Sequence, residues 1–196
     1  QVCYNSVVLA DKGEGLIGSL DCKTNYLTVT TTEKNETLKA IADEMADCWW
    51  MFGQGKIDYV KAGVSDKVSC AICSIVSFDK KTNEKMGSVS YTELYDYLRT
   101  NQKTTSESYL KYIYSVNSLE PFKEFPIENY LSNNIDTSKE YFILTGIAKE
   151  GWLISSSIFT LHLFSLGNIP YPLVMLEKTP ENYDAVGCDE FITKAG

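Results

Sequence analysis

The chain of 196 residues is 44% hydrophobic and carries a formal net charge of −8, from 26 acidic and 18 basic residues. A chain of this length buries about 70% of the surface that its unfolded form exposes, so we expect one globular domain that needs no metal or partner to fold. The excess of negative charge opposes the counterion release that drives binding to nucleic acids and anionic membranes, which excludes these partners from the leading interpretations.

No stretch reaches the roughly 18 consecutive apolar residues that a transmembrane helix requires. The sequence begins with Gln1 and shows no basic-then-apolar leader, which we interpret as the removal of an export signal or a membrane anchor. Contact with a membrane is therefore expected only through such an anchor.

The first part of the chain predicts two strands and a helix. The strands lie at residues 5–10 and 26–31, on either side of a glycine-rich turn. From Leu38 the apolar residues recur every three or four positions, which predicts an amphipathic helix that ends near Gly53.

Three acidic residues, Asp43, Glu44 and Asp47, lie on the polar side of this predicted helix. A metal or acid–base site would need further ligands from elsewhere in the chain. We interpret the cluster as a solvated helix face, on which Lys39 offsets the repulsion from four residues before Asp43.

The middle of the chain predicts a strand at residues 67–79 and a turn at residues 80–83. Two helices follow and run to about Thr100 and Val116. Each begins with a capping box, in which a hydroxyl residue precedes a glutamate by three positions. The two boxes are Ser90 with Glu93, and Thr104 with Glu107.

The last third predicts an irregular connection at residues 118–138, followed by strands near residues 140–148, 153–166 and 173–177. The order of the elements predicts an α+β fold with a mostly antiparallel sheet and about three helices on one face.

Six cysteines are spread along the chain without the spacing of a zinc site. This distribution favours an exported protein with up to three disulfides. Many pairings are possible, and our working hypothesis is Cys3–Cys22, Cys48–Cys70 and Cys73–Cys188.

Cys70 and Cys73 form a C-x-x-C sequence inside the predicted strand SCAICSIVSFD. Residues three apart in a strand point to opposite faces, so Cys70 should lie with Val68, Ile72 and Val76, and Cys73 with Ala71 and Ile75. A redox pair would instead begin at a helix N-terminus, which lowers the thiol pKa. Structural cysteines are the favoured interpretation, with a redox pair and a metal knuckle as alternatives.

Other catalytic signatures are missing. His162 is the only histidine and is predicted to be a half-exposed strand residue. The sequence has no G-x-S-x-G elbow, and residues 53–56 have part of a phosphate loop without its full spacing. We therefore assign no catalytic residue and no cofactor.

Aromatic residues give the one indication of binding. If one face of each helix is core, then Tyr97, Tyr114 and one of Trp49 and Trp50 should face outward. Exposed tyrosine and tryptophan are common interface anchors. The alternative is an ordinary core from which tyrosine hydroxyls reach solvent.

Two blocks carry a family resemblance: LKAIADEMADCWWMFGQGKIDY at residues 38–59, and SCAICSIVSFD with the downstream YTELYDYLRTN and SYLKYIY. Together they resemble an uncharacterised group of exported, membrane-anchored proteins of small-genome archaea of the DPANN type. The resemblance covers about two-thirds of the chain. It implies an extracytoplasmic location and a disulfide-stabilised domain, and it implies no activity.

Asn35 is a glycosylation candidate in the sequon Asn35-Glu36-Thr37, although it could simply cap the following helix. The leading hypothesis is a non-enzymatic extracellular or cell-surface protein, alone or as a subunit of an assembly, that presents aromatic surface to protein partners or to its own copies. One alternative is an extracytoplasmic thiol–disulfide oxidoreductase that uses Cys70 and Cys73. Another is a surface module that binds a ligand or glycan through Trp49, Trp50 and tyrosines.

Overall fold

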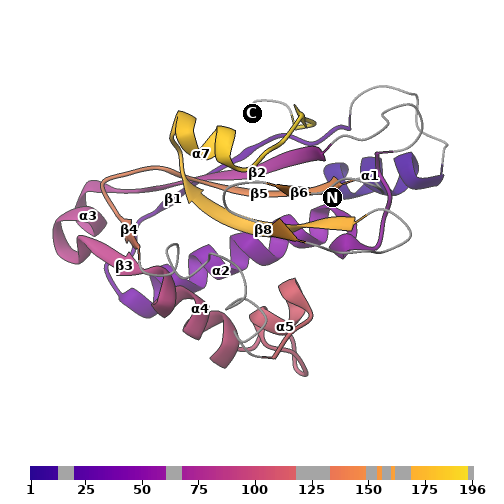
Figure 1. Ribbon diagram of the computed structural model, residues 1–196. Helices are drawn as coiled ribbons and strands as arrows, with labels where there is room; N and C mark the ends of the chain where they lie inside the picture. The colour runs from indigo at the N-terminus through magenta and orange to yellow at the C-terminus, as the bar shows by residue number, and fades with distance from the viewer. Residues whose placement is uncertain are drawn as a thin grey trace.

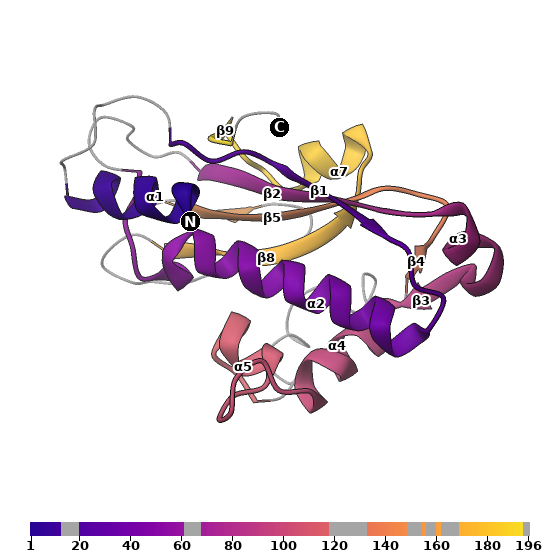
Figure 2. The same ribbon diagram turned by 180° about the vertical axis from the view of Figure 1, so that it is seen from behind.

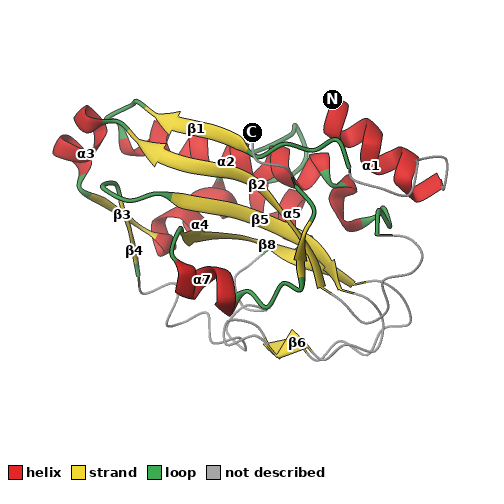
Figure 3. Cartoon of the chain, turned by 90° about the horizontal axis from the view of Figure 1, so that it is seen from above, coloured by secondary structure: helices red, strands yellow, loops and turns green. Residues whose placement is uncertain are grey.

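The computed structural model describes residues 1–12, 20–60, 68–117, 133–148, 154–155, 160–161 and 169–193. Within them, a central five-stranded sheet has the order β1-β2-β5-β8, and β9 pairs with β2 on the β1 side (Figure 1). Its strands are β1 (Asn25–Val29), β2 (Val68–Phe78), β5 (Tyr141–Ala148), β8 (Ile169–Glu177) and β9 (Glu190–Phe191). Figure 3 shows the four longer strands side by side in this order.

The sheet is mixed rather than uniformly antiparallel. β5 pairs antiparallel with both β2 and β8, whereas β1 and β9 run parallel to β2. Parallel neighbours require a crossover connection, and a long helix between β1 and β2 provides it. The predicted α+β class with a mostly antiparallel sheet is therefore confirmed, with parallel pairing on one side of β2.

Three helices form a layer on one face of the sheet, as expected, and a further helix lies on the opposite face near the C-terminus (Figures 1 and 2). The first layer contains α2 (Lys34–Met51), α4 (Tyr91–Thr100) and α5 (Tyr109–Tyr114), and the opposite face carries α7 (Pro180–Ala185). The described elements outside these layers are α1 (Val2–Lys12), α3 (Lys80–Met86), a 3-10 helix (Gly53–Gly55), and the strand pairs β3 (Ser88–Ser90) with β4 (Asn134–Asp136) and β6 (Ile154–Ser155) with β7 (Thr160–Leu161).

Two predictions of local secondary structure are wrong. Residues 5–10 belong to helix α1, whose buried residues Cys3 and Val7 are four positions apart, as a helix requires. Residues 80–83 begin helix α3, because the Asp79 side chain accepts a hydrogen bond from the Thr82 amide and caps the first turn.

The two predicted capping boxes have different outcomes. At Ser90 and Glu93 both reciprocal hydrogen bonds are present, and α4 follows directly. The Thr104 hydroxyl accepts from the amide of Glu107 in a turn, but α5 begins later, after Ser108 caps it. The predicted helix start at Thr104 is therefore wrong, because the helix begins at Tyr109.

Several predictions fall outside the described residues. They are the glycine-rich turn near residues 13–18, most of the connection at residues 118–138, and His162. The predicted strand at residues 153–166 is described only at its two short segments, β6 and β7.

The sheet separates two hydrophobic clusters of unequal size. The larger one lies between the sheet and the α2 layer and includes Ile41, Met45 and Ile143. The smaller one lies on the α7 face and includes Phe142 and Val186. Alternate residues of β5 thus enter different clusters, which fixes the register of this central strand.

The free edge of β8 is covered by side chains from three helices. The carbonyls of Leu173 and Met175 accept hydrogen bonds from the hydroxyls of Tyr114 and Tyr91, at 2.8 and 3.2 Å. Asn182 donates to the carbonyl of Glu177 at 2.8 Å. These bonds occupy acceptor groups that an edge strand would otherwise offer to another chain.

Gly146 allows β2 and β5 to approach closely. A Cβ atom at this position would lie 2.5 Å from the Ser69 carbonyl oxygen and 3.1 Å from the Cα of Cys70. We predict that Gly146→Ala lowers the free energy of unfolding by about 2 kcal/mol, because the backbone of β2 must move. Urea denaturation measures this loss, and an unchanged midpoint would contradict the close approach.

Candidate functional site

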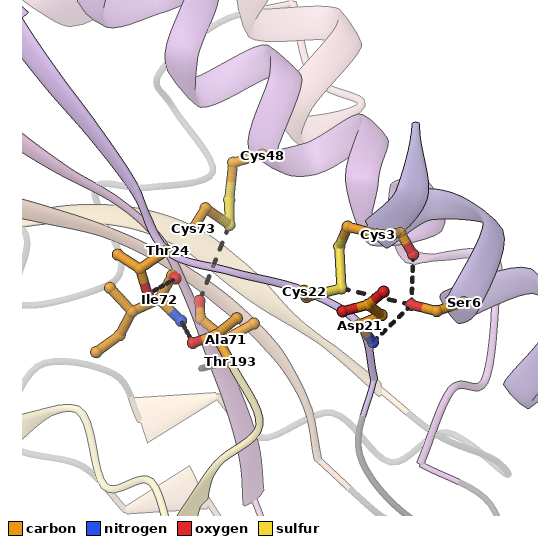
Figure 4. The surroundings of a disulfide bond; sticks show 10 residues. All are labelled: Cys3, Ser6, Asp21, Cys22, Thr24, Cys48, Ala71, Ile72, Cys73 and Thr193. Carbon is orange, nitrogen blue, oxygen red and sulfur yellow. Dashed lines mark hydrogen bonds between the residues drawn. A yellow bond between two sulfur atoms is a disulfide. The ribbon is translucent and has the colours of Figure 1, made fainter. Parts of the chain in front are cut away.

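The disulfide between Cys3 and Cys22 joins α1 to the segment that enters β1, as predicted. Around it, the Ser6 hydroxyl donates to the Cys3 carbonyl at 2.8 Å and accepts from the Asp21 amide at 3.1 Å (Figure 4). This local network attaches the N-terminal helix to the sheet.

The other two predicted disulfides have exchanged partners. Cys48 on α2 bonds to Cys73, and Cys70 bonds to Cys188 near the C-terminus. The prediction that Cys70 and Cys73 point to opposite faces of the strand is confirmed. The pairing was wrong because α2 covers the face of Cys73, and the strand pattern carries no information on which face a helix covers.

A β-bulge in β2 directs two successive residues towards α2. Ile72 lies opposite Leu144 and Ser74 lies opposite Ile143, so β2 has one extra residue, Cys73, at this point. The bulge also reverses the alternation that the sequence predicted, so that beyond it Val76 faces α2. Ile75 accordingly belongs to the cluster on the α7 face.

Both bulge residues contact α2 one helical turn apart. Cys73 forms the disulfide with Cys48 (Figure 4), and the Ser74 hydroxyl donates a hydrogen bond to the Glu44 carboxylate. Asn25 of β1 donates to the same carboxylate at 2.9 Å. Glu44 therefore links α2 to two neighbouring strands, whereas its predicted role was that of a solvated helix face.

The C-x-x-C sequence lacks the geometry of a redox site. Cys70 and Cys73 are buried, at 0% and 1% exposure, and each bonds to a distant cysteine. A reactive cysteine requires an accessible thiolate. In the described part of the chain, no group of three or more potential metal ligands is arranged to hold an ion.

The four aromatic residues predicted as an interaction surface are all half-buried. Trp49, Tyr97 and Tyr114 pack against the core on the α2 side of the sheet. Trp50 stacks on Tyr4 of α1, with ring centroids 4.5 Å apart. The hydroxyl of Tyr114 points inward, since it donates to β8. Each ring therefore presents only part of its surface to solvent.

More exposed rings lie on the α7 side of the sheet. Tyr26 of β1 and Phe191 of β9 are 61% and 44% exposed. Tyr183 of α7 contacts Phe191 edge-on, with centroids 6.1 Å apart, and stacks on Phe142 at 4.6 Å. Burial raises the pKa of Tyr183, and Tyr26 is near enough to contribute to that shift. We call Tyr26, Tyr183 and Phe191 the aromatic patch.

Helix α7 positions Tyr183 of the aromatic patch. The sequence-based expectations did not include this helix, although the sequence contains a signal for its start. The Thr179 hydroxyl accepts from the Asn182 amide at 3.2 Å, and Pro180 occupies the first turn. Threonine before proline at a helix start is a recognised N-terminal pattern. The side chain of Val186 is buried and anchors the end of the helix to the sheet.

A charged cluster connects α2 to α5 on the face of the sheet opposite α7. Asp43 accepts a hydrogen bond from the Tyr109 hydroxyl at 2.6 Å and pairs with Lys39 at 2.5 Å. Lys103 lies 3.5 Å from Asp43 and 3.4 Å from Asp47. Asp43 thus connects α2 to α5 through the Tyr109 hydrogen bond, and Asp43 and Asp47 connect α2 to the loop before α5 through ion pairs with Lys103.

Burial and hydrogen bonds shift the pKa values of Asp43 and Tyr109 in opposite directions. Partial burial by itself would raise the pKa of Asp43, but the hydrogen bonds from Lys39 and Tyr109 outweigh it and hold the pKa below its ordinary value. Burial and the Asp43 carboxylate together raise the pKa of Tyr109 well above its ordinary value. Asp43 is therefore ionised and Tyr109 neutral at physiological pH.

The glycosylation candidate Asn35 is exposed in the first turn of α2. It does not cap the helix, because Glu33 occupies the capping position. The sequon threonine, Thr37, is buried, and its hydroxyl donates to the Thr31 carbonyl at 3.4 Å.

Removing a disulfide should cost stability according to the loop that it closes. We expect Cys70→Ala/Cys188→Ala, which opens a separation of 118 residues, to lower the free energy of unfolding by about 5 kcal/mol. Cys3→Ala/Cys22→Ala, with a separation of 19, should cost about 3 kcal/mol. Urea denaturation under non-reducing conditions makes the comparison, and a reversed order would contradict it.

Asp43→Asn should lower the free energy of unfolding at pH 7 by about 1 kcal/mol, because it removes the charge that Tyr109 and two lysines contact. The pKa of Asp43 is lowered by folding, so its contribution is present above pH 4 and is lost as the pH falls through the folded value. The difference between variant and wild type should therefore disappear in acid. Asp96→Asn is the control, since among the described residues the Asp96 carboxylate pairs with Arg99 alone, at an exposed position; an equal loss there would contradict the role of Asp43.

Comparison with known proteins gives no relative. No protein-family model matches the sequence. No curated protein and no solved structure is significantly similar to the chain. Among the described helices, none combines the length and apolarity needed to cross a bilayer.

Proposed function

We propose that this chain is an exported, non-enzymatic protein of the cell surface or extracellular space that binds partner proteins through the aromatic patch. The observation that carries the proposal is the set of three intramolecular disulfides, which use all six cysteines. Such bonds persist in oxidising compartments and are rare in the cytosol. The resemblance to exported archaeal proteins supports the same location.

The aromatic patch supports the binding role. Phe191 and Tyr26 are the only aromatic residues among the large exposed hydrophobic residues of the described chain. They come from two strands that both pair with β2 and lie on the same face as α7. Rigid aromatic rings lose little conformational entropy on binding, which makes them effective interface anchors.

The two alternatives receive less support from the geometry. An oxidoreductase that uses Cys70 and Cys73 would require a thiol that solvent reaches, and both sulfurs are buried in separate disulfides. A glycan-binding module would require an exposed ring surface at Trp49 or Trp50, and both are half-buried.

The test compares the size of the chain in native material with that of the purified chain. We expect native material to sediment as a larger species under non-reducing conditions, and Phe191→Ser to return it to the size of the purified chain. Leu9→Ser is the matched control, because Leu9 on α1 is 45% exposed and Phe191 is 44% exposed. Native material that sediments like the purified chain, or equal effects of the two variants, would contradict the proposal.

A further inference from the structure

Asn35 lies in the first turn of α2, where the fold gives it no structural role. Its side chain is exposed, and it forms no hydrogen bond or ion pair with any described residue. Both neighbours have partners: Lys34 pairs with Glu93 at 2.7 Å, and Glu36 accepts a hydrogen bond from Thr31 at 2.9 Å. Asparagine forms helices less readily than lysine or glutamate and is favoured mainly at the capping position, which here lies two residues earlier. Helix formation therefore does not explain an asparagine at this position.

The same residue begins the only N-glycosylation sequon of the chain, Asn35-Glu36-Thr37. The side chains around its amide are also exposed: Lys34, Glu36 and, one helical turn later, Lys39. A sugar attached to Asn35 would therefore contact long side chains at the surface and would extend into solvent. The site can carry a bulky group without disturbing the core.

The position of α2 also suits a glycan on a protein that binds partners. Helix α2 lies on one face of the sheet and α7 on the other (Figure 2). A glycan at the start of α2 thus projects from the face opposite α7, which leaves Tyr183 and Phe191 accessible. Glycans of this type belong to exported proteins, and the three disulfides support an oxidising compartment.

The folded state hides the other half of the sequon. The enzyme that attaches the glycan recognises the asparagine together with the hydroxyl two residues later. In the folded chain Thr37 is 0% exposed, and its hydroxyl donates to the Thr31 carbonyl at 3.4 Å. Since the folded helix withholds this hydroxyl, the glycan must be attached while residues 35–37 are still unfolded.

We infer that Asn35 carries an N-linked oligosaccharide, which is transferred to the exported chain before α2 folds. Transfer forms a bond between Nδ2 of Asn35 and the anomeric carbon of a sugar, and it breaks the bond from that carbon to the phosphate of a lipid-linked donor. The amide loses one proton, and the lipid phosphate leaves with the bonding electron pair, so nothing is oxidised or reduced. The inference rests on the export that the proposed function includes, but it does not involve the aromatic patch.

Mass spectrometry of native material tests the modification. The peptide that contains residues 35–39 should be heavier by the mass of an oligosaccharide, with the sugar on Asn35. In the native host, Asn35→Gln and Thr37→Val should each abolish the modification, whereas Thr37→Ser should retain it. Thr37→Val keeps the branched shape, and the Thr31 carbonyl keeps a hydrogen bond from Thr82 at 2.9 Å, so the fold should persist.

The order of events has its own test. A membrane fraction of the native source, with its lipid-linked donor, should modify the chain when it is reduced and unfolded, and should leave the folded, disulfide-bonded chain unmodified. Equal modification of both forms overturns the inference, and so does an unmodified Asn35 in native material. Disulfide mapping of the same sample separates the two ideas: unmodified Asn35 with all three disulfides overturns glycosylation alone, whereas free cysteines would also overturn export.

Discussion

The contact between α2 and the β-bulge of β2 is the constraint on which the rest of the structure depends. The bulge turns Cys73 and Ser74 to the same side, where they meet Cys48 and Glu44. A covalent bond and a charge-assisted hydrogen bond, one helical turn apart, fix both the position and the rotation of the helix on the sheet. Helices α4 and α5 then pack beside α2, and their tyrosine hydroxyls reach the edge of β8.

Covering of sheet edges explains why several polar and aromatic side chains lie where they do. Tyr91 and Tyr114 are core residues whose hydroxyls bond to β8, so their phenol rings contribute both apolar contact and edge protection. At the other side of the sheet, the Cys70–Cys188 disulfide secures the chain directly before β9, which pairs with β2. Since a two-residue strand has few hydrogen bonds of its own, the covalent link is what makes this short C-terminal pairing stable.

Within the described residues, the remaining side of the sheet has β1 as its edge strand and carries the most exposed aromatic rings. β1 contributes an unprotected edge and Tyr26, while Phe191 and Tyr183 stand beside it on the α7 face. The aromatic patch gives the proposed surface protein a rigid platform, because its residues are carried by disulfide-linked strands and a helix rather than by loops.

The sequence by itself determined the local elements with strong periodicity or capping: α2, the Ser90 capping box of α4, and the strands around Cys70 and at residues 141–148. It also determined that Cys70 and Cys73 point apart, since alternation in a strand is a local property. Only the tertiary structure decided which cysteine meets α2, because that depends on the face a distant helix covers. Likewise, Trp49, Trp50, Tyr97 and Tyr114 have the right residue types for an exposed surface, yet packing between helices half-buries them. Tyr26 and Phe191 became neighbours of α7 through pairing with β2, a long-range contact that no local pattern encodes.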